Sequence, residues 1–438
     1  MEIIGSKKIA VISLGCPKNL TDSEVMLGQV LEAGYEIVSE ADGADVLLIN
    51  TCAFLESARS EASQQITESV ELKTKGKVQK IIVAGCLPVY DKEKLLEKWP
   101  QIDAVIGPAE IYKLSEILEK PEQKVYVGSL KYDLLPASRV IATGAGSAYL
   151  KIADGCDNRC AFCTIPRLRG PYRSKEEEVV LAEAETLVKS GIREIILIAQ
   201  DTTAYGKDLP GRLDLAGLIK KLAKFKELEW IRIMYAYPTH ITDSLIKVMA
   251  EEEKVCKYLD LPLQHIDSKI LQSMKRAAGE KEIRKVVKKL KAAIPEIALR
   301  TTFIVGYPGE REEQFEKLLD FIEESRFARV GAFTYSKEKG TSAAKLREQV
   351  AEGTKEQRYM RLMSLQNKIS KEQNKMFVGK ELKVLMETAK VGRSFRDAPE
   401  IDGIVQVDGT KNAPSPGDMV TVRITRSSDH DLGGKMVT

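Results

Sequence analysis

The sequence has no long apolar run and almost no net charge. Nowhere do about 18 apolar residues follow one another, so a membrane-spanning helix is excluded. The 67 basic residues nearly balance the 64 acidic ones, and the net charge of +3 gives no sign of a polyanionic partner. Neither a G-x-G-x-x-G loop nor a Walker A loop occurs, which excludes nucleotide binding by those two routes.

Histidine and cysteine are also scarce, with 3 His and 7 Cys among 438 residues. The cysteine count is odd and the spacing suggests no disulfide framework, so we expect a protein of the reducing cytoplasm. A hydrophobic content of 43% and a charged content of 30% are typical of a globular protein. A chain of this length predicts roughly two to four domains.

Three of the cysteines are spaced C-x3-C-x2-C, at Cys156, Cys160 and Cys163, directly after an apolar strand-like run. Three thiolates can hold three corners of a 4Fe–4S cluster and leave the fourth iron open for reaction. Zinc or three unrelated thiols are the alternatives. Zinc usually needs a fourth ligand nearby, whereas the nearest histidine is His240 and the next cysteine is Cys256.

The N-terminal part alternates between apolar runs and amphipathic stretches. Strands are predicted over residues 8–14, 45–50 and 80–84, and helices over 23–33 and 57–73. Continuous aliphatic runs are typical of strands that are buried on both faces of a parallel sheet. We therefore predict an open α/β sheet of the doubly wound type.

Each of these three predicted strands is followed by a cysteine: Cys16, Cys52 and Cys86. Because the carboxyl ends of parallel strands meet at one edge of the sheet, we expect the three thiols to converge there. Gly15 and Gly85, each next to a cysteine, would let the backbone approach a bulky cluster. The sequence thus predicts a second three-thiolate site, with three buried structural cysteines as the alternative.

After a linker of small residues, the alternation of strands and helices restarts. The predicted strands cover 149–153, 194–200, 230–236, 258–263, 298–305 and 329–335. Helices are predicted at 176–190, 214–225, 242–252, 281–293 and 311–325. Six such units are too few for a closed eight-unit barrel, so we predict a partial (β/α)6 barrel with the three-cysteine loop at the carboxyl end of its first strand.

Polar residues at the other strand ends become candidates for the site. These are Gln200-Asp201, Tyr235 to Pro238, Gln264-His265 and Gly306 to Glu310, with Arg300 inside the fifth strand. His265 could contact a ligand or hydrogen-bond to another site residue. Cys256 precedes the fourth predicted strand, so we interpret it as structural.

The last part of the chain shows short alternating runs at 381–387, 403–407 and 419–424. Turn signals separate them, including Asp408-Gly409 and Gly433-Gly434. The pattern predicts a small antiparallel β-barrel. From Met376 onward there are 9 basic and 9 acidic residues, whereas an RNA-binding module is usually basic, so a protein partner is favoured.

The C-x3-C-x2-C loop on a partial barrel resembles the radical S-adenosylmethionine superfamily. With Cys16, Cys52 and Cys86 ahead of it and a terminal barrel behind it, essentially the whole chain is similar to the methylthiotransferases. That family has an N-terminal α/β domain, a radical domain and a C-terminal TRAM domain. The resemblance implies domains at residues 1–138, 148–375 and 376–438, with a linker at 139–147.

The family has two main branches. One acts on a modified adenosine in transfer RNA, and the other, the RimO type, acts on an aspartate of the twelfth small-subunit ribosomal protein. Residues 13–19, 261–265 and 392–400 resemble the RimO type. The transfer-RNA branch tends to have Gln-Met-Asn and Gln-Ser-Gly-Ser where this chain has Pro17-Lys18-Asn19 and Gln264-His265-Ile266-Asp267.

The resemblance also implies the cofactors. Cys156, Cys160 and Cys163 would hold a 4Fe–4S cluster whose open iron binds S-adenosylmethionine, with Gln264 and Arg300 as candidate contacts to it. Its reductive cleavage gives a radical that can remove a hydrogen from the aspartate β-carbon. The other three cysteines would hold a second 4Fe–4S cluster that carries the sulfur, and a second S-adenosylmethionine would supply the methyl group.

The implied partners are the ribosomal protein, free or on the ribosome, and a reduced flavodoxin or ferredoxin-type electron donor, with no membrane. Two alternatives remain open at this point. One is a methylthiotransferase that acts on adenosine in transfer RNA, and the other is a non-enzymatic iron–sulfur electron carrier.

Overall fold

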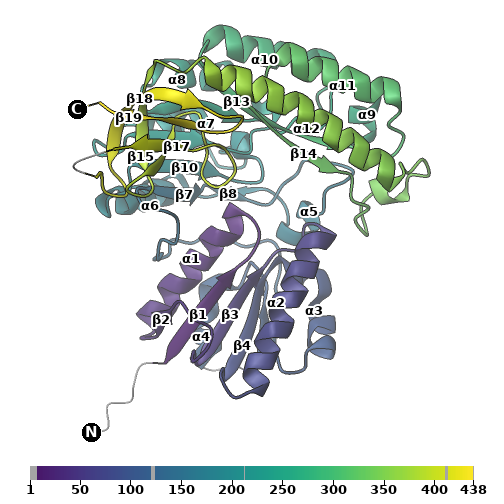
Figure 1. Ribbon diagram of the computed structural model, residues 1–438. Coiled ribbons are helices and arrows are strands. Elements are labelled where there is room, and N and C mark those ends of the chain that lie inside the picture. Colours follow the sequence, from purple (N-terminus) through teal and green to yellow (C-terminus); the bar gives the residue numbers. More distant parts are fainter. Residues whose placement is uncertain (1–6, 120–123, 212, 410–412, 438) are drawn as a thin grey trace. The chain divides into compact units, whose positions relative to one another are not determined.

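The computed structural model describes residues 7–119, 124–211, 213–409 and 413–437 (Figure 1). The described residues of Met1–Ala142, Ala153–Asp157 and Cys163–Lys175 form one compact unit. Those of Thr143–Ile152, Asn158–Phe162 and Glu176–Thr438 form a second one. The chain therefore passes between the two units several times around the three-cysteine loop.

The first unit is built on a parallel sheet with the strand order β2-β1-β3-β4-β5-β6, which confirms the predicted open α/β sheet (Figure 1). Its strands are β1 (Lys8–Ser13), β2 (Glu36–Val38), β3 (Val46–Thr51), β4 (Lys80–Gly85), β5 (Ala104–Ile106) and β6 (Val125–Tyr126). Its main helices are α1 (Pro17–Glu32), α2 (Glu56–Thr74), α3 (Cys86–Lys98) and α4 (Leu114–Glu119).

Apolar side chains cover both faces of this sheet. Met26 and Val30 of α1 and Leu114 of α4 pack with one face, and Ile66 of α2 and Leu95 of α3 pack with the other. The predicted start of the first helix at residue 23 was wrong. Helix α1 begins at Pro17, whose ring fixes a helical φ and needs no N–H partner at that position.

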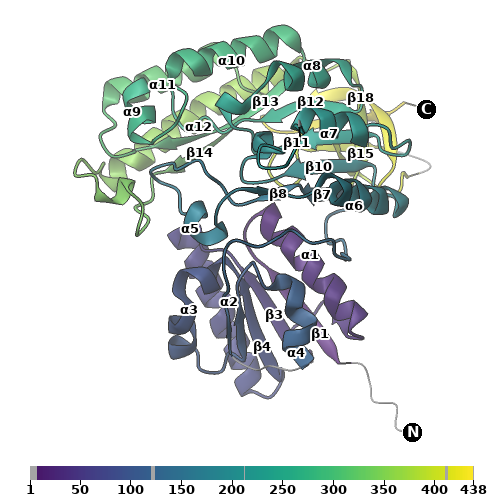
Figure 2. The ribbon, with the colours of Figure 1, turned by 180° about the vertical axis from the view of Figure 1, so that it is seen from behind.

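The second unit contains the predicted six-stranded partial barrel. Within the described residues, its parallel strands have the order β14-β13-β12-β11-β10-β7. They are β7 (Ser147–Lys151), β10 (Glu194–Ile198), β11 (Trp230–Ile233), β12 (Val255–Asp260), β13 (Ala298–Val305) and β14 (Arg329–Thr334). The connecting helices, seen from behind in Figure 2, include α6 (Glu177–Lys189), α7 (Leu215–Leu222), α8 (Asp243–Glu251), α9 (Ser268–Ser273), α10 (Glu280–Ala293) and α11 (Glu312–Ser325).

Two features of this unit differ from the prediction. Cys256 does not precede the fourth strand but is the second residue of β12, where it is buried. A long helix that the sequence analysis missed, α12 (Glu352–Lys375), packs against β14 and α11 (Figure 1).

The chain ends in a closed five-stranded barrel with the order β15-β16-β17-β19-β18, as predicted in outline. Its strands are β15 (Glu381–Met386), β16 (Val391–Ser394), β17 (Val405–Asp408), β18 (Met419–Ser427) and β19 (Leu432–Met436). Most pairs are antiparallel, but β17 and β19 are parallel. The predicted turn at Gly433-Gly434 was wrong, because both residues lie in β19, where a Cβ on Gly434 would overlap the Arg423 carbonyl oxygen of β18.

No helix in the described ranges combines the length and the apolar character needed to cross a membrane. The exact domain boundaries at residues 138, 148 and 376 stay predictions.

Candidate functional site

The three N-terminal cysteines lie at one edge of the first sheet. Cys16 immediately precedes α1, Cys52 follows β3, and Cys86 is the first residue of α3, directly after β4. Strands β1, β3 and β4 are neighbours in the sheet. The topology therefore brings the three thiols together at the carboxyl ends of adjacent strands.

Two glycines with positive φ shape the backbone around these thiols. A Cβ on Gly15, whose φ is +95°, would lie 2.6 Å from Cys52 Cβ and 3.3 Å from Cys52 Sγ. A Cβ on Gly85, whose φ is +94°, would overlap Asn50 Oδ1 and lie 2.5 Å from the Thr51 carbonyl oxygen. Only glycine fits at either place, so the thiol-bearing loops can approach one another closely.

A buried arginine that the sequence analysis missed reaches the same edge. Arg169 of the short helix α5 (Ile165–Arg169) donates through Nε to Cys86 Sγ at 3.3 Å. Its Nη1 donates to Asp22 Oδ2 at 2.6 Å and to Asp154 Oδ2 at 3.2 Å, and its Nη2 donates to Asn19 Oδ1. The guanidinium thus places a positive charge directly beside one of the thiols.

Burial and charge act in opposite directions on these thiols. Burial raises the pKa of Cys86 to about 12, although the Arg169 guanidinium lowers it. Burial also raises the pKa of Cys52, and the neighbouring Cys16 adds to that rise. Burial therefore favours the protonated thiols of these cysteines. A thiolate at this site needs a compensating cation, such as an arginine or a metal.

Side-chain amides fix the loops that carry Cys16 and Cys52. Asn19 Nδ2 donates to the carbonyl oxygens of Leu14 at 3.1 Å and Thr51 at 2.9 Å. Asn50 Nδ2 donates to the Asn19 carbonyl oxygen at 2.7 Å. Helix α1 is therefore hydrogen-bonded to both neighbouring strand ends.

Cys156 and Cys163 belong to the same unit as Arg169. The backbone N–H of Cys156 donates to the Gly170 carbonyl oxygen at 3.2 Å, and the N–H of Ile165 donates to Cys163 Sγ at 3.4 Å. Cys156 is buried and Cys163 is partly exposed. An N–H directed at sulfur stabilises a thiolate ligand, so this contact suits a metal-bound cysteine.

Cys160 belongs to the second unit, where Arg276 donates to its Sγ at 3.6 Å. Arg276 is held by the Pro262 carbonyl oxygen at 2.8 Å and lies 4.1 Å from the ring centroid of Tyr237. The adjacent Ala161 is tied to the barrel through its N–H, which donates to Met274 O at 2.8 Å. The loop segment with Cys160 therefore has fixed contacts to the residues that follow β11 and β12.

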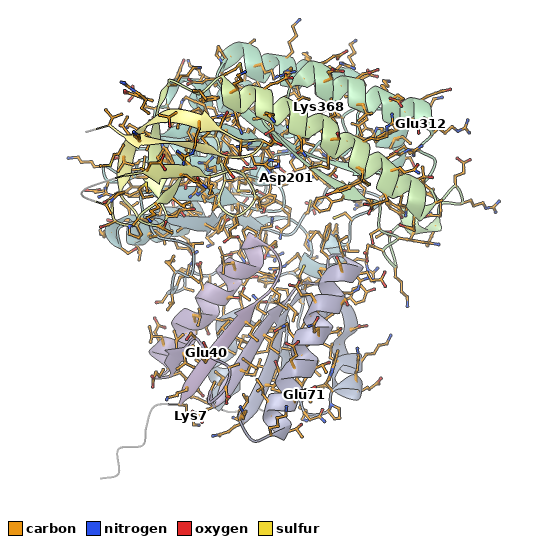
Figure 3. All side chains as sticks on the ribbon, in the orientation of Figure 1. Lys7, Glu40, Glu71, Asp201, Glu312 and Lys368 are labelled. Carbon is orange, nitrogen blue, oxygen red and sulfur yellow. The ribbon has the colours of Figure 1, made fainter. Side chains whose placement is uncertain are left out.

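A carboxylate at the end of β10 organises the neighbouring loops. Asp201, labelled in Figure 3, accepts from Asn158 Nδ2 at 2.6 Å and from Thr203 Oγ1 at 2.8 Å, and its Oδ2 lies 2.8 Å from His240 Nδ1. Burial alone would raise the pKa of Asp201, but these hydrogen bonds hold it below its usual value. Asp201 was a predicted candidate, whereas His240 was not.

Gln264 and His265 follow β12, and the structure gives them different surroundings. Gln264 has a φ of +74°, which a residue with a side chain rarely adopts, and its backbone pairs with Thr302 and Ile304 of β13. His265 is fully buried, accepts from Asp267 N at 3.0 Å, and has Nε2 3.4 Å from Glu310 Oε2. His265 thus accepts one hydrogen bond through Nδ1, its Nε2 has no hydrogen-bond partner among the described residues, and Gln264 is a strained residue.

Arg300 projects from the third position of β13, between two carboxylates. Its Nη1 donates to Asp260 Oδ1 at 2.8 Å, and its Nε lies 3.4 Å from Asp402 Oδ1 of the C-terminal barrel. Both carboxylates raise the pKa of Arg300, although burial opposes them. Its contact with a cofactor stays a prediction.

Three family models match consecutive parts of the chain. Residues 8–107 match the family described as "Uncharacterized protein family UPF0004", residues 150–322 match the radical SAM superfamily, and residues 378–437 match the TRAM domain.

Several curated relatives are similar over the full length, and each is described as "Ribosomal protein uS12 methylthiotransferase RimO". The relative from Elusimicrobium minutum is 47% identical over 98% of this chain and 100% of its own. Those from Geobacter sulfurreducens and Heliobacterium modesticaldum are 45% and 47% identical, over 99% and 100% of this chain and 99% and 96% of their own. This chain belongs to the RimO family.

Solved structures share the fold of this RimO-family chain at low sequence identity. The radical S-adenosylmethionine methyltransferase TsrM from Kitasatospora setae has a TM-score of 0.56, 13% identity and coverage of 75% of each chain. The cobalamin-dependent enzyme OxsB has a TM-score of 0.51, 14% identity and coverage of 84% of this chain and 56% of its own. At such identities the likeness shows the fold alone.

A radical SAM domain in the RimO family implies a 4Fe–4S cluster and S-adenosylmethionine, and the N-terminal family is consistent with a second cluster. Among the described residues, no three His, Cys, Asp or Glu side chains are grouped as ligands of one metal ion. A cubane takes one thiolate per iron, so its ligands are spread more widely. Three thiols at one sheet edge, with Gly15 and Gly85 directly before two of them, are a donor set that suits an iron–sulfur cluster.

Proposed function

We propose that this chain is a methylthiotransferase that adds a methylthio group to the β-carbon of an aspartate in ribosomal protein uS12. The single observation that carries the proposal is the full-length similarity, at 47% identity, to a relative described as a ribosomal protein uS12 methylthiotransferase. The substrate would be met in the cytoplasm, either free or on the ribosome.

We propose a 4Fe–4S cluster at each three-cysteine set. Cys16, Cys52 and Cys86 would hold one, and Cys156, Cys160 and Cys163 the other. When bound, the two clusters and S-adenosylmethionine would supply a carbon-centred radical and a sulfur atom for insertion. The electron for this chemistry would come from a reduced flavodoxin or ferredoxin-type protein.

The residues of the chain would hold and orient these groups. Gly15 and Gly85 would leave the space that the first cluster needs, and Arg169 would offset the negative charge of its thiolates. Arg276 would do the same beside Cys160. We propose that two residues contact S-adenosylmethionine: Gln264, which follows β12, and Arg300, which lies within β13.

A transfer-RNA substrate is the second candidate, and the charge of the C-terminal barrel argues against it. Two of its exposed arginines are already paired: Arg423 donates to Glu381 Oε1 at 2.6 Å, and Arg426 pairs with Asp408. Paired arginines leave less free positive charge for phosphates than an RNA-binding module needs. A protein substrate is therefore favoured.

The test uses two separate reactions, each with anaerobically reconstituted enzyme, a reductant and S-adenosylmethionine. One reaction receives total ribosomal protein and the other receives total transfer RNA. Mass spectrometry should find the added methylthio group on an aspartate of uS12. A product found only in RNA would end the proposal. Release of 5′-deoxyadenosine distinguishes a methylthiotransferase of either substrate class from an electron carrier, which would release none.

Iron analysis tests the ligand assignment. We expect about eight irons per chain in the wild type, and about four in either Cys52→Ala or Cys160→Ala. Cys160→Ala should abolish 5′-deoxyadenosine release, whereas Cys52→Ala should retain some release and lose methylthio transfer. Cys256→Ala is the matched control and should keep the full iron content. Equal loss of both activities in the two variants, without unfolding, contradicts the division of labour.

A further inference from the structure

A cavity of about 700 Å³ lies between the C-terminal barrel and the six-stranded sheet of β7 and β10–β14, which we call the radical sheet. Both belong to the same compact unit. On the sheet side, the cavity is lined by the first residues of three strands: Trp230 of β11, Val255 and Cys256 of β12, and Ala298 of β13. It therefore lies at the amino ends of the strands, whereas the reaction sites of barrel folds lie at the carboxyl ends.

Apolar and aromatic side chains make up much of both walls of this cavity. The opposite wall includes Met376 and Phe377, which follow α12, Leu382 of β15, and Phe395, which follows β16. Cavities of roughly 300–1,000 Å³ with such walls and a few fixed polar groups are typical of sites for small molecules. The cavity has the size and the walls of a ligand site.

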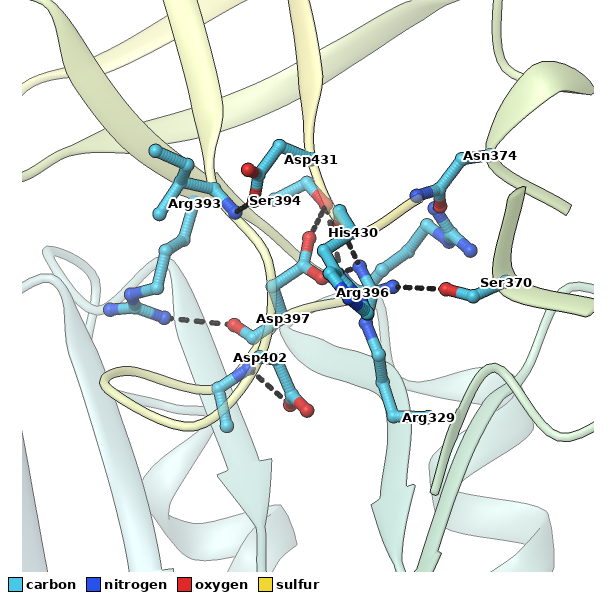
Figure 4. Close-up of polar contacts among 12 residues, drawn as sticks. Arg329, Ser370, Asn374, Arg393, Ser394, Arg396, Asp397, Asp402, His430 and Asp431 are labelled. Atoms are coloured by element: carbon cyan, nitrogen blue, oxygen red, sulfur yellow. Dashed lines mark hydrogen bonds and ion pairs between the residues drawn. The ribbon is translucent and has the colours of Figure 1, made fainter. Parts of the chain in front are cut away.

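The fixed polar group of this cavity is Arg396, which is only 3% exposed. Its guanidinium carbon lies 3.9 Å from the ring centroid of Phe377, and its Nη1 donates to Asn374 Oδ1 at 3.2 Å (Figure 4). Asn374 is itself fully buried, and its Nδ2 donates to the Ser428 carbonyl oxygen at 3.2 Å. The guanidinium is thereby held in one place at the cavity wall.

Arg396 has no ion pair within the part of the chain that the structure describes. Two nearby buried arginines do have one: Arg393 Nη2 lies 2.7 Å from Glu194, and Arg329 pairs with Asp397 at 2.5 Å (Figure 4). Burial lowers the pKa of Arg396 to about 10. A buried cation without a counter-charge costs free energy, and an anion bound in the cavity would remove that cost.

The other charges of the lining indicate how much negative charge the cavity takes. The lining has four basic and three acidic side chains, which leaves one positive charge in excess: Lys257, Lys380, Lys383, Arg396, Glu253, Glu296 and Glu381. Lys380 Nζ lies 4.9 Å from the centroid of the Phe377 ring that Arg396 also contacts. Two cations therefore contact one aromatic ring, and one negative charge would balance the lining.

We propose that this cavity binds a small organic anion, with one carboxylate bonded to Arg396 and an apolar body packed against the aromatic walls. A planar guanidinium fits a carboxylate through two parallel N–H···O bonds. Because the ligand contacts both walls, it stabilises the attachment of the C-terminal barrel to the radical sheet. This site is separate from the proposed methylthio transfer and does not depend on it.

The test titrates 2-naphthoate, a flat aromatic carboxylate, into the reconstituted full chain in a calorimeter. We expect one site per chain. The uncharged isostere 2-naphthamide should bind about tenfold more weakly or worse, because the hydrogen bonds to a charged group are lost. 2-Naphthyl phosphate should bind no more tightly than 2-naphthoate, since the lining offers one excess positive charge. Bound 2-naphthoate should slow hydrogen exchange at residues 255–257 and 376–383.

Two exposed positions give a matched pair of variants. Met376 lines the cavity and is 61% exposed, whereas Val378 lies outside the lining and is 44% exposed. Met376→Glu should weaken 2-naphthoate about tenfold, because it places a like charge at the site. Val378→Glu should change the dissociation constant by less than about twofold.

Arg396→Gln tests the assigned contact directly and should make the affinities for 2-naphthoate and 2-naphthamide equal. If this buried substitution prevents folding, the comparison of Met376→Glu with Val378→Glu still decides, because both of those positions are exposed.

Equal affinities of 2-naphthoate and 2-naphthamide for the wild type would overturn the proposal. So would equal effects of Met376→Glu and Val378→Glu, tighter binding of 2-naphthyl phosphate, or no binding at millimolar concentration. None of these measurements contains S-adenosylmethionine, ribosomal protein or RNA. A failure here is therefore distinct from a failure of the proposed function.

Discussion

Arg169 is the residue on which the N-terminal thiol edge depends most. Its guanidinium is buried and bonded to Cys86, Asp22, Asp154 and Asn19. Arg169→Met should lower the free energy of unfolding of the cluster-free protein by about 3–5 kcal/mol, because the buried carboxylates of Asp22 and Asp154 each lose an ion pair with the guanidinium. Urea denaturation measures the change.

Arg167→Met, on the exposed side of the same short helix, is the control for Arg169. It should change the unfolding free energy by less than about 1 kcal/mol, because the polar contacts of an exposed side chain contribute little. Equal stability of the two variants would mean that the buried guanidinium is dispensable.

Asp201 gives a prediction about pH. Its hydrogen bonds to His240, Thr203 and Asn158 lower its pKa in the folded protein. A lowered carboxyl pKa stabilises the fold at pH values above the unfolded pKa of about 4, and this stabilisation disappears as the pH falls through the folded value. Asp201→Asn should therefore cost about 1–3 kcal/mol at pH 7, and less as the pH falls below about 4.

Urea unfolding of wild type and Asp201→Asn between neutral and acidic pH measures this convergence. Asp208→Asn, at a nearby exposed position, is the control and should change the unfolding free energy at neutral pH by less than about 1 kcal/mol. A difference for Asp201→Asn that stays constant with pH would contradict the assigned hydrogen bonds.

At the scale of elements, the turn from β4 into α3 sets the position of Cys86. Gly85→Ala should destabilise the cluster-free protein by about 3 kcal/mol or more. The new Cβ would clash with Asn50 and the Thr51 backbone, and alanine would be strained at the positive φ of this position. It should also reduce the iron content of reconstituted protein by weakening one cluster site.

Gly76→Ala is the control for Gly85. Gly76 has a φ of +74°, and no atom lies within 4 Å of the place its Cβ would take. Only the backbone strain of about 1 kcal/mol should appear, with normal iron content. A Gly85→Ala protein that binds iron normally would show that the turn tolerates a side chain.

The elements that the sequence predicted well are those whose packing surface is apolar. Strand β13 (Ala298–Val305), with Leu299, Phe303, Ile304 and Val305 among its residues, was predicted with its observed limits, whereas the limits of β7 and β12 were predicted two or three residues too late. Helix α12 was missed because its buried side includes Lys355, Arg358, Gln366 and Asn374, so no apolar period marks it. The two-residue strand β6 is too short to leave any pattern.

The same distinction holds for the site. The cysteines were visible because their spacing and their places after strands are local features of the sequence. Arg169 was missed because its partners Asn19 and Asp22 lie 150 and 147 residues away in the chain. His240 was missed for the same reason, since its carboxylate partner belongs to a different strand end.

At the scale of the whole molecule, the C-terminal barrel and the radical sheet share a buried charge system in one compact unit. Glu194 lies at its centre, fully buried and bonded to both Arg232 and Arg393. Burial alone would raise the pKa of Glu194, but the two guanidinium groups lower it. The stability it contributes is present above the unfolded pKa of about 4 and is lost as the pH falls.

Glu194→Gln should therefore cost about 3–5 kcal/mol at pH 7, because it removes the buried carboxylate that Arg232 and Arg393 share, although Arg393 keeps its pair with Glu387. Glu229→Gln is the matched control, since Glu229 also pairs with the C-terminal barrel, through Lys383 at 4.0 Å, but both side chains are 40% exposed or more. That exposed pair should contribute less than about 1 kcal/mol. Urea unfolding should show a gap between the two variants at pH 7 that narrows under acid. If Glu194→Gln and Glu229→Gln lowered the unfolding free energy equally, both at pH 7 and at acidic pH, the buried charges would not join the barrel to the sheet.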